Sequence, residues 1–260
     1  MIEIKGITKK YDQLVVLDRV NLKIKDKSVT ALIGPNGAGK STLLGVISKL
    51  LKEDSGSVLI DGESHVKIKP IDFAKKVGLL KQTNQINVNI TIRELVSFGR
   101  WPHSKGNLLK TDIKKIDEAI KFMKLGDIEH KSINQLSGGQ KQRAYIAMIV
   151  AQDTKYILLD EPLNNLDMKY AVDMMLILQN LVQKLGKTVV IVLHDINIAA
   201  TFADYIVAMK DGRIVKEGTP NEIMDKETLD YVYDHEFCIA GVNGRKYCIY
   251  TNELKKEVFA

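Results

Sequence analysis

No run of apolar residues in this sequence is long enough to span a bilayer. The longest reach about six residues, as at Ile146–Ala151, whereas a membrane helix needs roughly 18–20. The N-terminus carries an early acid, Glu3, and lacks an apolar core of signal-peptide length. We therefore expect a soluble, intracellular protein, so that any membrane part of the process it serves belongs to other chains.

Cysteine is scarce, with only Cys238 and Cys248 in the sequence. The two flank Val242–Arg245, whose Asn-Gly centre is typical of a two-residue hairpin turn. That register places Cys238 opposite Ile249 and Cys248 opposite Ile239, so the two sulfurs point to opposite faces of the hairpin. We expect both cysteines to be packing residues and no disulfide between them.

Metal-site spacing and a strong charge of one sign are also missing. The histidines at positions 65, 103, 130 and 235 stand alone, without the spacing of a metal site. Basic residues outnumber acidic ones by 38 to 32, and this excess of +6 is spread along the chain. Charge therefore does not choose among nucleic acid, a membrane surface and nucleotide phosphates as partners.

The 260 residues, 45% of them hydrophobic, suffice for one large domain with a packed core. Strand-like segments alternate with helical ones, which predicts an α/β fold with a parallel sheet covered by helices. Helices broken near Trp101-Pro102 and Gly106 fill the middle, from about 90 to 131. We predict strands at Ile2–Ile7, Val20–Ile24, Val29–Ile33, Val58–Ile60, Val77–Leu80, Tyr156–Leu159 and Thr188–Leu193, helices at Lys40–Leu51, Thr111–Lys124, Gly139–Ala151 and Met168–Leu185, and, after Gly218, short helices and a hairpin at Phe237–Tyr250.

The first motif is the glycine loop Gly34–Ser41, which follows an apolar strand and opens a helix. This matches a P-loop, in which glycines let successive backbone N–H groups turn toward one phosphate. The helix that begins at Lys40 adds its partly positive end. We expect Lys40 to reach the β- and γ-phosphates, Ser41 to offer its hydroxyl to Mg²⁺, and Thr42 to bond the α-phosphate.

Two carboxylates, Asp160 and Glu161, end the apolar strand at Tyr156–Leu159. A buried strand ends in paired acids where a cation or a water molecule needs them. Asp160 is suited to hold Mg²⁺ through its water shell, and Glu161 to act as the base that polarises the attacking water. Adjacent side chains of a strand point in opposite directions, which predicts different roles for the two acids.

The next strand ends in His194, which could lie beside the γ-phosphate and couple to Glu161. Gln82 follows the strand at Val77–Leu80 and could contact both Mg²⁺ and the water. Gln85 is close in sequence, and spacing alone does not choose between the two glutamines.

A second glycine-rich helix start lies at Leu136–Arg143, with Ser137, Gly138, Gly139 and Gln140 at its head. Two glycines at a helix start make an anion-binding end. One nucleotide does not need two such cradles from one chain. The sequence therefore predicts a two-fold dimer that holds two ATP molecules at its interface.

This second segment strongly resembles the signature of ATP-binding-cassette ATPases, and the resemblance covers nearly the whole chain. It implies a P-loop NTPase fold with a mixed sheet, an N-terminal antiparallel β subdomain and a helical insertion. It implies a core of about 1–88 and 132–220, an insertion of about 89–131 and a tail of about 221–260. It also implies that Tyr11 stacks on adenine, Gln82 senses the γ-phosphate, His194 is a switch, and Asn164–Asp167 runs between the two sites, where the family more often has Ser before Leu-Asp. The nucleotide-binding residues are then Tyr11, Gly34, Asn36, Gly37, Ala38, Gly39, Lys40, Ser41, Thr42, Ser137, Gly138, Gly139 and Gln140.

Thr91–His103 looks like the segment that follows the sensing glutamine in importers of iron chelates and vitamin B12. Leu79–Ile86 and Glu161–Met168 are more like the iron-siderophore branch. The resemblance thus implies an ATPase that drives import of an iron-siderophore complex. Its partners would be a second copy, a separate permease and, indirectly, an extracytoplasmic binding protein, at the cytoplasmic face of the membrane.

Three alternatives stay open at this point. The cargo could be haem or cobalamin, since cargo contacts lie in other chains. A soluble cassette ATPase acting on nucleic acid usually shows two cassettes, a zinc insertion or a coiled coil, none of which is present, so we expect no nucleic-acid partner. A non-catalytic interaction module is disfavoured because every catalytic position is filled.

Overall fold

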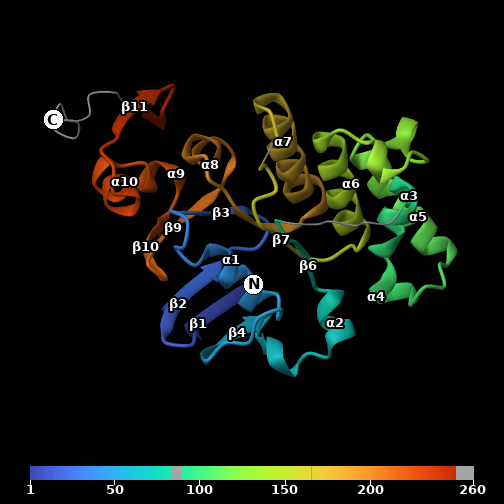
Figure 1. The fold of residues 1–260 in the computed structure, drawn as a ribbon, viewed down its shortest axis with the longest axis horizontal. Coiled ribbons are helices and arrows are strands. Elements are labelled where there is room, and N and C mark those ends of the chain that lie inside the picture. The colour runs from blue at the N-terminus through green and yellow to red at the C-terminus, as the bar shows by residue number, and fades with distance from the viewer. Residues whose placement is uncertain (83–88, 165, 250–260) are drawn as a thin grey trace.

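A computed structural model of the protein describes residues 1–82, 89–164 and 166–249. Strands alternate with helices along the chain, as the sequence predicts (Figure 1). The strands are β1 Ile2–Tyr11, β2 Leu14–Ile24, β3 Val29–Ile33, β4 Ser55–Ile60, β5 Glu63–Ser64, β6 Val77–Leu80, β7 Tyr156–Leu159, β8 Thr188–Val192, β9 Tyr205–Lys210, β10 Arg213–Gly218, β11 Cys238–Val242 and β12 Arg245–Ile249. The helices are α1 Lys40–Ile47, α2 Pro70–Ala74, α3 Ile92–Phe98, α4 Trp101–Ser104, α5 Lys110–Phe122, α6 Gly138–Ala151, α7 Met168–Leu185, α8 Ile196–Phe202, α9 Pro220–Ile223 and α10 Lys226–Tyr233.

A six-stranded sheet forms the centre of the described chain, in the order β10-β9-β3-β8-β7-β6. All neighbours pair in parallel except β9 and β10. Every residue of β3, β7 and β8 is buried, because helices cover both faces of the sheet. The parallel strands β3, β6, β7 and β8 therefore bring their carboxyl ends, and the motifs that follow them, to one edge.

A second sheet, antiparallel, has the order β2-β1-β4-β5 within the described residues. Figure 1 shows it in blue below the central sheet, with α1 between the two. Both sheets bury apolar side chains against α1 in one shared cluster. The expected N-terminal antiparallel subdomain is therefore confirmed, with longer strands than predicted, and the pairing of β1 with β2 continues past register shifts after Ile4.

The helical part at 92–122 packs against α6, and α3, α5 and α6 share one apolar cluster. Figure 1 shows these helices together on the right of the molecule. The predicted breaks near Trp101-Pro102 and Gly106 are confirmed, because α3 ends at Phe98 and α4 ends at Ser104. Helix α4 itself begins at Trp101, with proline in its first turn, where a missing N–H costs nothing. In the part of the chain that the structure describes, no helix has the length and apolar character needed to cross a bilayer.

Two further elements differ from the sequence prediction. Helix α1 stops at Ile47 rather than Leu51, because Lys49 turns into the left-handed region and the amides of Leu50 and Leu51 both bond to Gly45 O. The β9–β10 hairpin was not predicted, although its Asp-Gly turn at 211–212 is a recognised hairpin signal.

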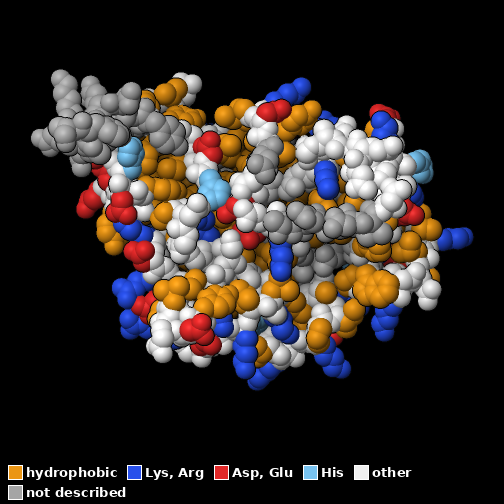
Figure 2. Space-filling model, in the orientation of Figure 1, with side chains coloured by type: hydrophobic (Ala, Val, Ile, Leu, Met, Phe, Trp, Pro, Cys, Tyr) orange, Lys and Arg blue, Asp and Glu red, His pale blue; other side chains and the backbone are white. Residues whose placement is uncertain are grey.

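The C-terminal hairpin has the predicted register, with Cys238 opposite Ile249 and Cys248 opposite Ile239. Both thiols are free, as expected. Cys248 is buried, whereas Cys238 is exposed, so the prediction that both are packing residues is wrong for Cys238. Tyr250, the predicted end of this hairpin, lies outside the described residues. Figure 2 shows Lys and Arg side chains spread around the rim of one face and interspersed with acidic ones, which agrees with the mild overall charge.

Candidate functional site

The glycine loop between β3 and α1 wraps around a hollow of about 140 Å³. At Gly34, φ is 142° and an added Cβ would lie 2.1 Å from the carbonyl oxygen of Met209 on β9, so only glycine fits. Ala38 is buried beneath the loop. The hollow is lined by Asn36, Gly37, Gly39, Lys40, Ser41 and Thr42, together with Val16 and Glu161.

Lys40 is the charged centre of this loop and is only 5% exposed. Its Nζ donates to the carbonyl oxygens of Gly34 and Pro35, each at 2.8 Å. Burial lowers the pKa of Lys40 below its ordinary value, while the carboxylates of Glu161 and Asp160 act in the opposite direction. The ammonium group is thus bonded within its own loop and lies beside the hollow, where it could reach a bound anion.

Ser41 and Asp160 join the first turn of α1 to the end of β7. The Ser41 hydroxyl donates to Asp160 Oδ1 at 2.8 Å. Burial raises the pKa of Asp160 above its ordinary value; the bond from Ser41 lowers it and the neighbouring charge of Glu161 raises it further. A hydroxyl and a carboxylate side by side form an all-oxygen donor set.

Three side chains converge on the carboxylate of Glu161, which is 10% exposed. Gln82, after β6, donates from Nε2 to Oε2 at 2.6 Å, and Asn164 donates from Nδ2 to the same oxygen at 2.5 Å. His194, after β8, places Nε2 2.8 Å from Oε1. Glu161 itself has φ of 50°, in the left-handed region that is uncommon for non-glycine residues and that this chain also uses at several turns.

These contacts agree with the expected neighbourhood of Glu161, His194 and Gln82, and they add Asn164. Sequence reasoning put Asn164 only in a connecting loop, since nothing in its position announces a bond to a residue three places earlier. Asp160 and Glu161 have separate sets of partners, as predicted, but both lie beyond the end of β7 and Glu161 is left-handed, so strand alternation is not the cause. Gln85 and Asn165 lie outside the described residues.

The second glycine segment starts α6. Ser137 and Gln140 form a reciprocal capping box, in which Ser137 Oγ accepts from the Gln140 amide at 3.3 Å and Gln140 Oε1 accepts from the Ser137 amide at 3.1 Å. Ser137 and Gly138 are exposed, whereas Gly139 is buried against the ring of Tyr170. The helix start is thus rigid, yet open on its outer side to a second molecule.

Tyr11 ends β1 and is 46% exposed, with Lys9 Nζ 5.4 Å from the centre of its ring. It does not line the hollow at the glycine loop; Val16, on the same β1–β2 hairpin, does. An exposed ring beside that hairpin leaves a face on which a planar base could stack.

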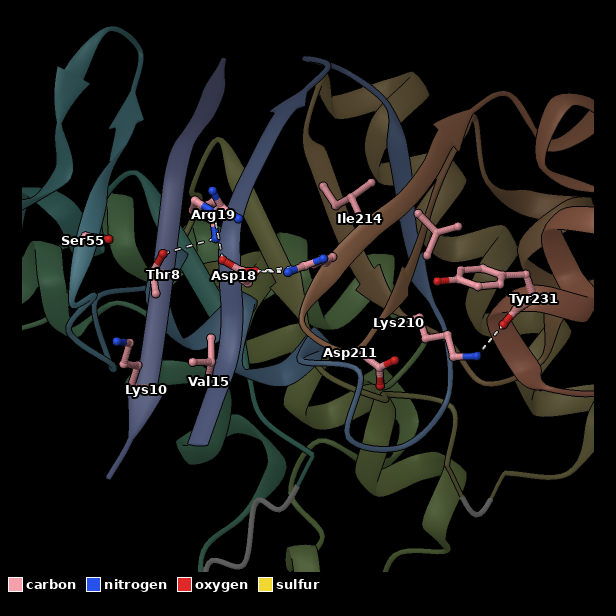
Figure 3. A pocket seen from close by; sticks show the side chains of 12 residues that line it. Thr8, Lys10, Val15, Asp18, Arg19, Ser55, Lys210, Asp211, Ile214 and Tyr231 are labelled. Carbon is pink, nitrogen blue, oxygen red and sulfur yellow. Dashed lines mark hydrogen bonds and ion pairs between the residues drawn. The ribbon is translucent and has the colours of Figure 1, made fainter. Parts of the chain in front are cut away.

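A larger hollow, of about 850 Å³, lies between the β1–β2 hairpin and the β9–β10 hairpin (Figure 3). None of its lining residues is among those predicted to bind nucleotide. The ion pair of Asp18 with Arg213, 2.9 Å from Nε, spans it. The neighbouring turn residue Gly212 accepts from the Asp18 amide at 3.0 Å and donates to Ala38 O at 3.2 Å. We interpret these contacts as a brace between the antiparallel sheet and the glycine loop.

Comparison with known proteins gives a consistent family. The ABC transporter family model matches residues 17–164. The petrobactin import ATP-binding protein YclP of Bacillus subtilis (strain 168) is 51% identical over 250 residues, covering 96% of this chain and 99% of that protein. The petrobactin import ATP-binding protein FatE of Bacillus anthracis is 44% identical, covering 90% and 94%.

Among solved structures, the dimeric structure of MJ0796, a bacterial ABC transporter cassette, matches with a TM-score of 0.75 and 34% identity. The match covers 85% of this chain and 99% of that one. Sequence and fold therefore agree over most of the chain: it belongs to the ABC transporter family, as an ATP-hydrolysing cassette.

Proposed function

We propose that this chain powers the import of an iron-siderophore complex through a separate permease, as a homodimer at the cytoplasmic face of the membrane. The observation that carries the ATPase part is the cluster around Glu161, where the ends of β6, β7 and β8 meet beside the glycine loop. The cargo class is supported by the relatives, which are named petrobactin import proteins.

ATP would enter from the open side of the glycine loop. Lys40 would leave the carbonyl oxygens of its own loop for the β- and γ-phosphates, because a phosphate is the stronger acceptor. Tyr11 would stack on adenine, and Thr42, Asn36, Gly37 and Gly39 would surround the phosphates. Chemistry of this kind depends mostly on positioning and on stabilising charge.

Ser41 and Asp160 fit Mg²⁺, because both offer hard oxygen atoms and already lie within hydrogen-bond distance. In the described part of the chain no three His, Cys, Asp or Glu residues gather into a metal site, so phosphate oxygens and water would complete the coordination. When bound, the ion would neutralise charge on the phosphates. Gln82 is the third residue that we assign to the ion.

Glu161 is the proposed base for the attacking water. Gln82, after β6, and His194, after β8, each contact one oxygen atom of the Glu161 carboxylate. The carboxylate is therefore oriented before ATP binds. Gln82 would sense the γ-phosphate and signal its presence to the permease. His194 would bond the γ-phosphate from the opposite side.

The exposed start of α6 is the proposed site for the partner's ATP. Ser137, Gly138, Gly139 and Gln140 of one chain would close on the nucleotide held by Lys40 of the other. The dimeric form of the MJ0796 cassette supports this arrangement. We further propose a core of about 1–88 and 132–220, a helical insertion of about 89–131 and a tail of about 221–260. An extracytoplasmic binding protein would take part indirectly, through the permease.

Cargo uptake tests the proposal. In a strain that lacks this chain, plasmids carrying the wild type should restore uptake of radioactive iron from a ferric siderophore, whereas Glu161→Gln should not. Haem and cobalamin are the comparison cargoes. Uptake of iron-siderophore that is unchanged by the deletion, with loss of haem or cobalamin uptake instead, would reassign the cargo while keeping the ATPase.

A further inference from the structure

Arg100 and Asp112 form a buried ion pair that the proposed mechanism does not use. Their side chains are 8% and 4% exposed, and Arg100 Nε lies 2.9 Å from Asp112 Oδ1. The second oxygen of Asp112 accepts from the Leu109 amide at 3.0 Å. A buried pair gains little stability over packed apolar residues, because both charges lose water. The pair therefore calls for an explanation beyond stability.

The remaining bond of Arg100 points to that explanation. Its Nη1 donates to the carbonyl oxygen of Ala151 at 2.7 Å. Ala151 is the last residue of α6, whose first residues are Gly138 and Gly139. A cation at this position also interacts favourably with the partly negative end of a helix.

Neighbours of Arg100 hold the same helix end. The backbone of Gly99 lies so close to Met148 O that an added Cβ would be 2.0 Å from that oxygen. The His103 ring has Nε2 3.0 Å from Gln152 O. Three residues of one short segment thus fix the last turn of α6.

The opposite end of this helix carries the glycine segment. Helix α6 has 14 residues, so its two ends are about 20 Å apart, and an α-helix of this length behaves as a stiff rod. A change in how its last turn is held will tilt its first turn. Fixing the last turn therefore fixes the direction in which Ser137 and Gly138 face.

We propose that Arg100, oriented by Asp112, is a positioning residue for the segment Ser137–Gly139. It acts through α6 and does not touch ATP. This inference rests on the proposed role of Ser137–Gly139 at the partner's nucleotide, and it deepens that role. The segment Gly99–His103 is then the support that presents the helix start to the second chain.

The test compares ATP-driven dimerisation with ATP binding to the single chain. In a Glu161→Gln background, Arg100→Lys and Arg100→Met should retain nucleotide affinity within about twofold. Their dimerisation, measured by analytical ultracentrifugation at saturating ATP, should be weaker by about tenfold or more, because Ser137 and Gly138 would no longer be held facing the second chain. Lysine keeps the charge but lacks the planar fork that bonds Asp112 and Ala151 together.

Leu229→Ala is the matched control for a loss of stability, because Leu229 is fully buried in α10, away from α6. It should lower the melting temperature without changing the dimer constant at a temperature well below melting. If Arg100→Met fails to fold, Asp112→Asn keeps the side-chain volume and should show the same weaker dimerisation.

The outcomes separate the two proposals. Dimerisation of folded Arg100 and Asp112 variants that equals that of the Glu161→Gln parent overturns the positioning role. A weakening equal to that of Leu229→Ala at matched melting temperature also overturns it. Failure of the Glu161→Gln parent itself to dimerise with ATP points instead to the proposed function.

Discussion

At the scale of single residues, the site lowers the stability of the folded chain mainly through its buried charges. Burial raises the pKa of Asp160 and lowers that of Lys40. The charged form of each group is therefore less favourable in the folded chain than in the unfolded chain. Three side chains contact the Glu161 carboxylate, whose residue also has a left-handed backbone. Such sites are built for a ligand at the expense of stability.

Asp160→Asn tests this trade-off. A carboxyl group whose pKa is raised by folding favours the folded state at low pH, and that contribution is lost as the pH rises through the folded pKa. At pH 7 the amide variant without nucleotide should therefore melt higher than the wild type, by about 2–4 °C if 1 kcal/mol is regained. The difference should shrink toward zero below the ordinary pKa of Asp, near 4.

Thermal unfolding from about pH 3 to about pH 8, which brackets the ordinary pKa of Asp, measures this difference. Asp173→Asn on the exposed side of α7 is the control, with no expected change. A nucleotide-free Asp160→Asn variant that is less stable than the wild type at pH 7 would contradict the burial argument. The same variant should lose the further stabilisation that Mg-ATP gives to the wild type.

At the scale of elements, the strands that end in a motif were predictable, and so was the meeting of Gln82, Glu161 and His194 at one edge of the sheet. The boundaries of β3, β6 and β7 agree with those expected, since each apolar run stops where Gly34, Lys81 or Asp160 follows it. The β9–β10 hairpin was missed, although apolar residues of both strands flank its Asp-Gly turn. The Arg100–Asp112 pair could not be read from spacing, because it depends on how α4 and α5 pack on α6.

Gly138→Ala tests the start of α6 as an element. A Cβ at Gly138 would meet nothing within 4 Å in the single chain, and alanine favours a helix over glycine by up to about 1 kcal/mol. We expect unchanged or higher stability and unchanged ATP binding to the single chain. In the Glu161→Gln background the ATP-driven dimer should be lost, because the methyl group occupies room needed by the partner's phosphates.

Gly126→Ala is the control for this substitution, because a Cβ at Gly126 also meets nothing within 4 Å. It should leave both stability and dimerisation near the parent values. A Gly138→Ala chain that dimerises as well as its parent would show that the outer side of this helix start faces solvent throughout the cycle.

At the scale of the whole molecule, each proposed nucleotide site is shared between two chains. Within one chain the hydrogen bonds of Ser137 and Gln140 are to each other, and the hollow at Lys40 is lined by residues of the glycine loop, β2 and the end of β7. The sequence predicted this arrangement from the presence of two anion-binding helix starts. A single chain in isolation cannot display the contact between them.

Mixing two inactive chains tests whether the sites are shared. Both variants are made in the Glu161→Gln background. Lys40→Ala removes the phosphate contact, and Gly138→Ala blocks the contact of the α6 start with the partner's ATP, so neither chain alone should trap ATP in a dimer. In an equal mixture half of the dimers pair one chain of each kind. Every such dimer has one site with an intact Lys40 from one chain and an intact Gly138 from the other, so about a quarter of all sites should recover. Filter retention of labelled ATP measures this recovery, and a mixture that retains no more ATP than its components would place both halves of each site within one chain.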